Sequence, residues 1–182
     1  MKTLLVLRHA KSDRGDNALR DYDRPLAPRG EADAPRMGTA LIALATIPDR
    51  VLTSTAVRAR ETTRLVTAVM GYTGEIIEAP TIYAAAVDAL LDVLRDSGDA
   101  ETVLLVGHNP GLEELICLLT GGMDAAPMVR LPTAGLACLA LDIKAWSEIH
   151  ERCGLLHWFL IPRIVYPLLH ASRDPTHQKE ND

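Results

Sequence analysis

Near its start the chain reads Leu4-Leu5-Val6-Leu7-Arg8-His9-Ala10-Lys11-Ser12, and this stretch decides the fold class. An apolar run that ends abruptly in charged residues predicts a short strand over 3–7, buried on both faces as in a parallel sheet. Arg8 and His9 would then stand at the carboxyl end of that strand. Ligands bind beyond this end of the strands in open α/β sheets, so the stretch marks a candidate site as well.

Outside this stretch, short apolar runs alternate with segments of helical spacing. Strands are predicted over 50–53, 75–78, 101–107, 136–141 and 155–161, and helices over 29–45, 55–70, 87–96 and 110–119. The spacing of the apolar residues predicts that these side chains of the first two helices face the core: Ala34, Met37, Leu41, Leu44, Val57, Leu65 and Val69. The alternation predicts an α/β fold of three layers, a mostly parallel open sheet with helices on both faces. We expect one domain over 1–170 and a polar, flexible tail over 171–182.

The composition argues against several classes of protein. The 182 residues carry a net charge of -5, whereas a nucleic-acid binder needs a basic surface. Cys117, Cys138 and Cys153 are an odd number at wide spacings, which favours neither a disulfide framework nor a zinc site. The longest apolar segment, 155–169, is interrupted by prolines and charges and is too short to span a bilayer. We therefore expect a cytoplasmic protein with no nucleic-acid or membrane partner, no metal and no cofactor.

Two further predicted strands lead, like the first, into chemically capable residues. The strand over 50–53 is followed by Arg58 one helical turn into the next helix, and the strand over 101–107 is followed at once by His108. Parallel strands bring their carboxyl ends to one edge of the sheet. We therefore expect four side chains to converge there: Arg8, His9, Arg58 and His108.

This set of side chains suits phosphoryl transfer. A neutral imidazole is a competent nucleophile towards phosphorus, and we assign that role to His9. Guanidinium groups grip phosphoryl oxygens bidentately and stabilise the charge that spreads over them in the transition state, which suits Arg8 and Arg58. The two arginines should also keep His9 neutral near pH 7. His108, if protonated, adds a further donor.

Helix starts are expected beside the same edge. Asn109 is placed to cap a helix that begins at Pro110, whose free N–H groups would point at an anion, and Asn109 is itself a candidate substrate-binding residue. Thr55 is expected to cap the helix that carries Arg58. Each of these residues alone has an ordinary structural explanation, and it is their joint occurrence at successive strand ends that favours a site.

The same residues resemble the motifs of the histidine phosphatase superfamily, whose fold is that of phosphoglycerate mutase. Within it the chain looks most like the SixA-type phosphohistidine phosphatases. The matching segments are Arg8-His9-Ala10-Lys11-Ser12, Asp23-Arg24-Pro25-Leu26, Ser54 to Thr62, Gly107-His108-Asn109-Pro110-Gly111 and Leu131-Pro132-Thr133-Ala134-Gly135. The resemblance implies a phosphoglycerate-mutase-like sheet without a large lid insertion. It also implies that His9 becomes phosphorylated while Arg8, Arg58 and His108 hold the phosphoryl group.

The chain departs from the wider superfamily where a general acid is expected. Larger mutase-like members carry a glutamate in an insertion after the third strand, and the corresponding residues 81–88 contain none. Acid-phosphatase-like members place an aspartate after the second histidine, where this chain has Asn109. The candidates that stay open are Asp13, Asp16, Asp21 and Asp88. Because imidazole leaves readily once its ring is protonated, whereas an alkoxide needs a proton donor, the departure favours phosphohistidine as substrate.

Other functions stay compatible with the sequence. A small-molecule phosphomonoesterase would share all four residues, and a non-catalytic phospholigand-binding module would share the arginines and His108. The partner is accordingly a phosphohistidine-bearing protein or a small phosphorylated substrate. An interaction protein could use the apolar segment 155–169, which fits a packed C-terminal piece and a dimer face equally well. The sequence leaves the oligomeric state open.

Overall fold

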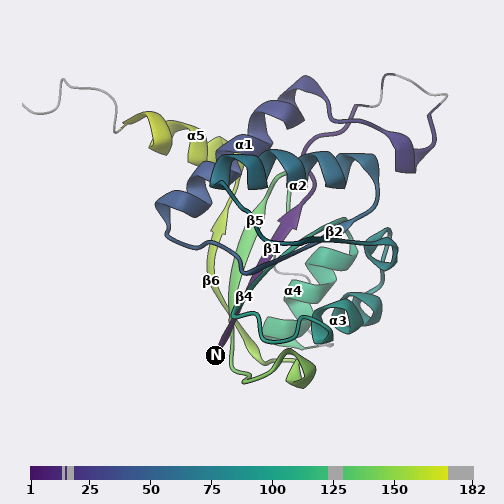
Figure 1. Ribbon diagram of the computed structural model, residues 1–182, viewed down its shortest axis with the longest axis vertical. Helices are drawn as coiled ribbons and strands as arrows, with labels where there is room; N and C mark the ends of the chain where they lie inside the picture. Colours follow the sequence, from purple (N-terminus) through teal and green to yellow (C-terminus); the bar gives the residue numbers. More distant parts are fainter. Residues whose placement is uncertain (14, 16–18, 123–128, 172–182) are drawn as a thin grey trace, which may run out of the picture.

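The predicted strands assemble into one six-stranded sheet, in the order β3-β2-β4-β1-β5-β6 (Figure 1). The computed structural model describes residues 1–13, 15, 19–122 and 129–171. The strands are β1 (Lys2–Arg8), β2 (Arg50–Ser54), β3 (Ile76–Ala79), β4 (Thr102–Gly107), β5 (Leu136–Leu141) and β6 (Gly154–Leu160). The helices are α1 (Pro28–Ala43), α2 (Val57–Met70), α3 (Val87–Arg95), α4 (Gly111–Gly121) and α5 (Pro162–Ala171). The strands β1 to β4 are parallel and β5 and β6 pair antiparallel, so the mostly parallel sheet is confirmed.

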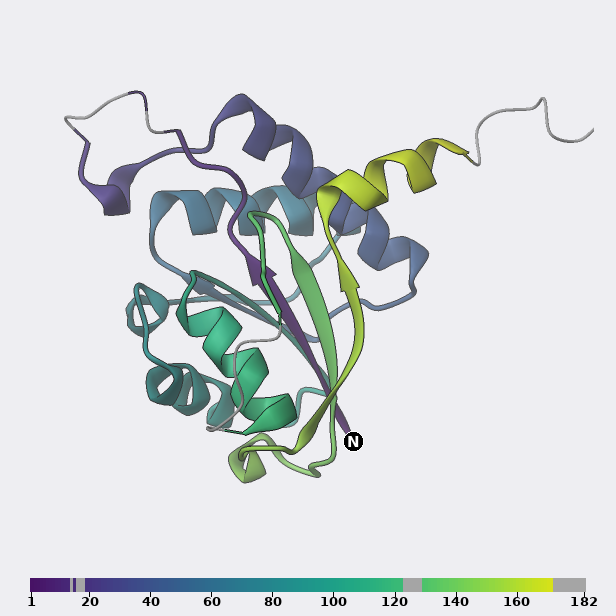
Figure 2. The same cartoon turned by 180° about the vertical axis from the view of Figure 1, so that it is seen from behind.

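Helices cover both faces of the sheet, as the alternation predicts. The helices α1, α2 and α5 lie on one face, and α3 and α4 lie on the other (Figures 1 and 2). The central strand β1 shows why. Its Leu5 and Leu7 enter the core shared with α1 and α2, whereas Leu4 and Val6 enter the core shared with α3 and α4. Burial on both faces explains the uninterrupted apolar run from which the fold was predicted.

Helix α2 buries a different face from the one that apolar spacing predicts. The residues predicted inward but found half-buried or exposed are Leu44, Val57, Leu65 and Val69. In α2 the buried face consists of Arg58, Ala59, Thr62, Thr63, Val66 and Thr67. The threonines tolerate burial because each donates its hydroxyl to a backbone carbonyl one turn earlier. Close packing against α1 favours such small residues, since a Cβ at Gly38 would lie 2.6 Å from Val66 O.

The C-terminal apolar segment divides into the edge strand β6 and helix α5, and this helix was not predicted. Helix α5 packs on α1, where Val165 is buried and the Arg36 guanidinium lies 4.5 Å from the centre of the Tyr166 ring. The predicted tail falls on residues 172–182, outside the described part of the chain, apart from Ala171 at the end of α5. No helix within the described ranges is long and apolar enough to cross a membrane.

The loop between β1 and α1 is closed at its neck by backbone contacts. Ser12 and Leu26 form an antiparallel bridge, and Ala27 N donates a hydrogen bond to Lys11 O at 2.8 Å. Gly30, in the first turn of α1, approaches so closely that a Cβ there would lie 2.2 Å from Lys11 O. The neck therefore fixes where the loop leaves and rejoins the sheet edge.

Candidate active site

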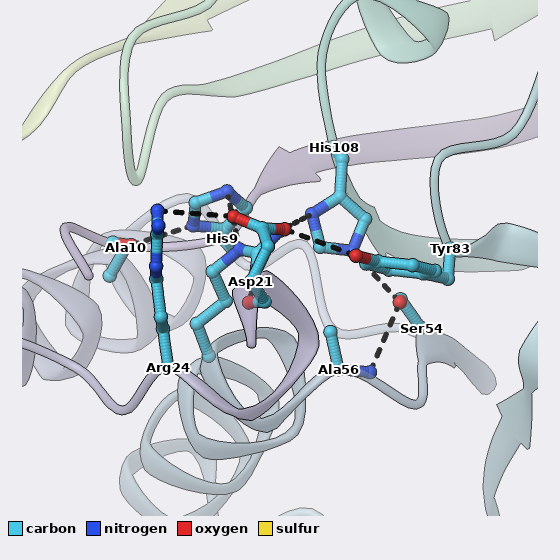
Figure 3. A network of polar contacts seen from close by, with 9 residues as sticks. His9, Ala10, Asp21, Arg24, Ser54, Ala56, Tyr83 and His108 are labelled. Carbon is cyan, nitrogen blue, oxygen red and sulfur yellow. Dashed lines mark hydrogen bonds and ion pairs between the residues drawn. The ribbon is translucent and has the colours of Figure 1, made fainter. Parts of the chain in front are cut away.

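The carboxyl ends of β2, β4 and β1 are neighbours in the sheet, and the two predicted histidines come together beside them (Figure 3). His9 follows β1 and His108 follows β4, and their ring centres lie 5.0 Å apart. Arg58, in the first turn of α2, contacts both rings. Arg8 is close enough for its charge to lower the pKa of each histidine. The predicted convergence is thus observed.

Hydrogen bonds fix the tautomer of His9. Arg58 Nε, which can only donate, lies 3.2 Å from His9 Nε2, so Nε2 carries the lone pair. His9 Nδ1 then carries the proton and donates it to Ala10 O at 2.7 Å. Burial, followed by the charges of Arg58 and Arg8, lowers the pKa of His9 to about 4. The expectation of a neutral His9 holds, although burial contributes more than the arginines do.

His108 is held in a matching way by Ser54. Arg58 Nη2 lies 3.3 Å from His108 Nδ1, which makes Nδ1 the acceptor, and the other ring nitrogen donates to Ser54 Oγ at 2.8 Å. Burial, followed by the neighbouring His9 and Arg58, lowers the pKa of His108 to about 3. In this arrangement the ring is neutral, so the extra donor expected from a protonated His108 requires an anion beside it to raise its pKa.

Asp21 enters the site from the loop between β1 and α1. Its Oδ2 lies 2.8 Å from Arg58 Nη2 and accepts from Tyr83 OH at 3.1 Å, while Oδ1 pairs with Arg24 Nη1 at 3.2 Å. The backbone carbonyl of Asp21 also accepts from Arg58 Nη1. Burial alone would raise the pKa of the Asp21 carboxyl, but Arg58, Tyr83 and Arg24 outweigh it and the pKa is lowered. At neutral pH Asp21 is therefore a carboxylate.

A loop before β5 holds the remaining side of the site. Arg8 Nη1 donates to Leu131 O at 2.8 Å, and Ala134 N lies 3.2 Å from His9 O. The amide nitrogen of Asn109 donates to Leu131 O at 2.9 Å and to Glu113 Oε1 at 2.8 Å. Glu113 Oε1 in turn accepts from Leu131 N at 2.7 Å. Asn109 thus ties this loop to α4, and these two hydrogen bonds of its side chain go to Leu131 and Glu113 and not to the histidine rings.

Both predicted helix caps are wrong. The cap of α4 is Pro110 rather than Asn109, and no side chain caps that helix. The amide nitrogen of Asn109 donates to Leu131 O and Glu113 Oε1, and its Oδ1, the atom that would cap the helix, is buried and accepts no hydrogen bond from the described residues. The cap of α2 is Ala56 rather than Thr55, and Ala56 N donates to Ser54 Oγ at 3.3 Å. The serine that orients His108 therefore also accepts a hydrogen bond from the backbone just before α2.

Of the acidic candidates, Asp21 alone is described in contact with the site. Asp13 and Asp88 are exposed, and Asp16 lies outside the described residues. Tyr83 and Ser54 were not singled out as site residues. Tyr83 carries no distinctive spacing signal, whereas Ser54 begins the matching segment Ser54 to Thr62, and its spacing from Arg58 could have pointed to it. In the described ranges, no group of three or more His, Cys, Asp or Glu side chains is placed to hold a metal ion.

Comparison with known proteins agrees with this geometry. The family model of the histidine phosphatase superfamily (branch 1) matches residues 4–82, which include His9 and Arg58. An uncharacterized protein of Mycobacterium tuberculosis is 37% identical over 169 residues, which cover 86% of this chain and all of that protein.

Solved structures show the same relationship. The chain resembles a candidate phosphohistidine phosphatase, SixA, of Agrobacterium tumefaciens with a TM-score of 0.74 and 30% identity, covering 88% of this chain and 98% of that one. A second candidate SixA, from Nakamurella multipartitia, gives a TM-score of 0.75 and 29% identity over 88% and 96% of the two chains.

Proposed function

The chain belongs to the histidine phosphatase superfamily, and on that premise we propose that it is a phosphohistidine phosphatase whose nucleophile is His9 Nε2. One observation carries the proposal: a neutral imidazole presents its lone pair to the Arg58 guanidinium, whose N–H groups suit phosphoryl oxygens. The 30% and 29% identical SixA structures support the substrate class.

In the first step, an oxygen of the substrate phosphoryl group takes over the Arg58 Nε–H. This releases the lone pair of His9 Nε2, which attacks the phosphorus in line as the P–N bond of the substrate breaks and its electron pair returns to the substrate imidazole. Arg58 and Arg8 stabilise the charge on the equatorial oxygens. The arriving anion raises the pKa of His108, which then donates to the same oxygens.

In the second step, water attacks the phosphorus of phosphorylated His9. The bond to Nε2 breaks, and its electron pair returns to the imidazole. The Nδ1 proton stays on His9 throughout, held by Ala10 O, so that the ring leaves as a neutral imidazole. The water adds its hydroxyl to the phosphoryl group and its proton passes to the released phosphate or to solvent.

The absence of a carboxylic acid in contact with the two histidines, among the described residues, favours phosphohistidine over phosphate esters. Asp21 is there but ionised, so it cannot protonate an alkoxide at neutral pH. General acid catalysis contributes about 10²- to 10⁴-fold in rate, which is the disadvantage we expect for metabolite esters. We further propose that arginine and histidine donors suffice without a metal, and that the protein is cytoplasmic, consistent with three cysteines that form no disulfide.

The test compares turnover of a phosphohistidine peptide with turnover of 3-phosphoglycerate and a sugar phosphate, with and without a chelator. We expect the peptide to be hydrolysed fastest, with no effect of the chelator. Faster turnover of either metabolite would replace this proposal with a small-molecule phosphomonoesterase.

A second experiment tests the nucleophile. The variant His9→Ala should lose turnover and lose the trapped phosphoenzyme, whereas His157→Ala, at an exposed position on β6, should keep both. Wild-type turnover by His9→Ala would contradict the assignment. Binding of phosphate ligands without any turnover by the unaltered protein would indicate a binding module instead.

A further inference from the structure

Asp21 lies on the solvent side of the two histidines. Its side chain exposes 52% of its surface, whereas His9 and His108 each expose 8%. In Figure 3 its carboxylate lies beside both rings. A phosphorylated protein reaches the buried His9 from solvent, so the group that departs from the phosphorus must stand on the exposed side. Asp21 is therefore placed next to the leaving group and not beneath the phosphoryl group.

The surroundings of Asp21 form a rim, which we define as Asp21, Tyr22, Arg24 and Tyr83. Tyr22 and Tyr83 meet edge to face with ring centres 5.1 Å apart, and Tyr83 also meets the His108 ring at 5.5 Å. A carboxylate beside two aromatic rings suits a flat cationic ring, which gains a charge-assisted hydrogen bond and a cation–π contact. It does not suit an anionic group such as the carboxylate of 3-phosphoglycerate.

We propose, resting on the function above, that the Asp21 carboxylate accepts a hydrogen bond from the ring N–H of the substrate's phosphohistidine and so selects a substrate ring that is protonated on its second nitrogen. Asp21 would then be a catalytic and specificity-determining residue that contacts the leaving group.

The chemistry balances without a proton donor. The substrate ring carries the phosphoryl group on one nitrogen and a proton on the other. When His9 Nε2 bonds to phosphorus, the P–N bond of the substrate breaks and its electron pair returns to the ring. The product is a neutral imidazole that keeps its N–H, still bonded to Asp21. The carboxylate stays ionised throughout, in agreement with the lowered pKa of Asp21.

The hydrogen-bond count also favours this role. In the structure Asp21 Oδ2 shares Arg58 Nη2 with His108 Nδ1. A phosphoryl group that recruits Arg58 draws this donor away from the carboxylate, and the ring N–H of phosphohistidine replaces it. The charged and titratable groups that face Asp21 are Arg24, Arg58 and Tyr83, with His9 and His108 behind them.

Three probes separate this role from a structural one. Phosphoimidazole has a ring N–H, its N-methylated analogue is a permanent cation without an N–H, and p-nitrophenyl phosphate has neither. We expect Asp21→Asn to lower kcat/KM for phosphoimidazole by roughly 100-fold, and at least ten times more than for the other two. The alkaline limb of the phosphoimidazole pH profile should also move to lower pH in Asp21→Asn, because the carboxylate no longer raises the pKa of the bound ring.

The matched control is Asp23→Asn, the same change two residues away, where the carboxylate pairs with Arg20. It should behave as wild type on all three probes. Equal losses on the three probes in Asp21→Asn, or an unmoved pH profile, would overturn the role of Asp21 while leaving the proposed function standing. An unaltered protein that hydrolyses p-nitrophenyl phosphate but not phosphoimidazole would overturn both.

Discussion

Two parts of the site differ in how they are built. The floor, which we define as Arg8, His9, Ser54, Arg58 and His108, stands at the ends of buried strands and in the first turn of a helix. The rim stands on the 3-10 turn Asp21–Asp23, within the loop between β1 and α1, and directly after the 3-10 turn Pro80–Ile82, and it is half-exposed or exposed. The floor has the hydrogen-bond donors and the nucleophile that act on any phosphoryl group. The rim faces the leaving group, which differs from one substrate to another. The comparison teaches that phosphoryl transfer depends on the floor and substrate choice depends on the rim. Substitutions in one should therefore alter one property without altering the other.

The largest effect should come from the floor. Arg58→Ala removes the guanidinium that contacts both histidines, and loss of an arginine that stabilises a phosphoryl transition state costs about 10³- to 10⁵-fold in kcat. The control is Arg60→Ala on the same helix, an exposed residue paired with Glu78, which should stay near the wild-type rate. Steady-state kinetics with a phosphohistidine peptide would measure both variants. Similar losses of rate in Arg58→Ala and Arg60→Ala would show that any change on α2 impairs the enzyme and that Arg58 has no special catalytic role.

The buried histidines should make the protein less stable in acid. The pKa values of His9 and His108 are about 4 and about 3 in the fold, below the ordinary 6.5. Between these values and 6.5 the unfolded chain binds more protons, so the free energy of unfolding falls as the pH drops below 6.5. One unit of pKa difference is worth about 1.4 kcal/mol, and each histidine contributes more than two units over this range, so we expect a loss of about 6 kcal/mol between pH 7 and pH 4.

Denaturant unfolding at several pH values would measure this loss. The variant His9→Asn should show a shallower dependence on pH, whereas the exposed His157→Asn should follow the wild type. A variant at His9 with an unchanged slope would show that the acid sensitivity comes from elsewhere.

A smaller effect is expected at Ser54, which orients His108 but does not itself contact the substrate. Ser54→Ala removes the acceptor that fixes the His108 tautomer, and we expect a loss of about 10- to 50-fold in kcat, with little change in KM. An NMR titration should also show an altered pKa of His108. Ser97→Ala, another fully buried serine that is not in the site, is the control for burial alone. Equal kinetics of the two variants would show that Ser54 does not position His108.

The smallest effect should come from the hydroxyl of Tyr83 in the rim. Tyr83→Phe removes the hydroxyl that donates to Asp21 but keeps both ring contacts, so we expect a loss of about 2- to 5-fold in kcat/KM for phosphoimidazole. Tyr72→Phe removes a comparable hydroxyl outside the site and serves as the control. A loss in Tyr83→Phe as large as in Arg58→Ala would mean that rim and floor act as one unit.

The sequence predicts the floor well and the rim poorly, for a physical reason. Strands buried on both faces leave a continuous apolar signal, and parallel pairing brings their ends together, so the sequence alone suffices to bring His9, Arg58 and His108 to one edge. Asp21 could only be grouped with other aspartates, because its contact with Arg58 depends on how a loop crosses the sheet edge. The hydrophobic periodicity of the sequence, which predicts helices and strands, does not predict the path of this loop.

The same distinction explains the predictions that were wrong. The cap expected from Asn109 is not formed, since its amide nitrogen binds Leu131 O and Glu113 Oε1 and its Oδ1 accepts no hydrogen bond within the described part of the chain. Neither of these two contacts follows from the local pattern of a helix start. The buried face of α2 was misjudged because apolar spacing assumes that cores are apolar. Buried threonines that bond their own helix satisfy the core without that signal.

The closed neck of the loop between β1 and α1 has an evolutionary consequence. Because Ser12, Leu26, Lys11 and Ala27 are joined by backbone bonds, the chain within the loop can be lengthened, shortened or rewritten without disturbing the strand that precedes it. Loop-closure entropy rises only slowly with length, by about 0.6 kcal/mol for each doubling. Descendants of such a protein could exchange one leaving group for another by mutating a single exposed segment, while inheriting the same reaction unaltered.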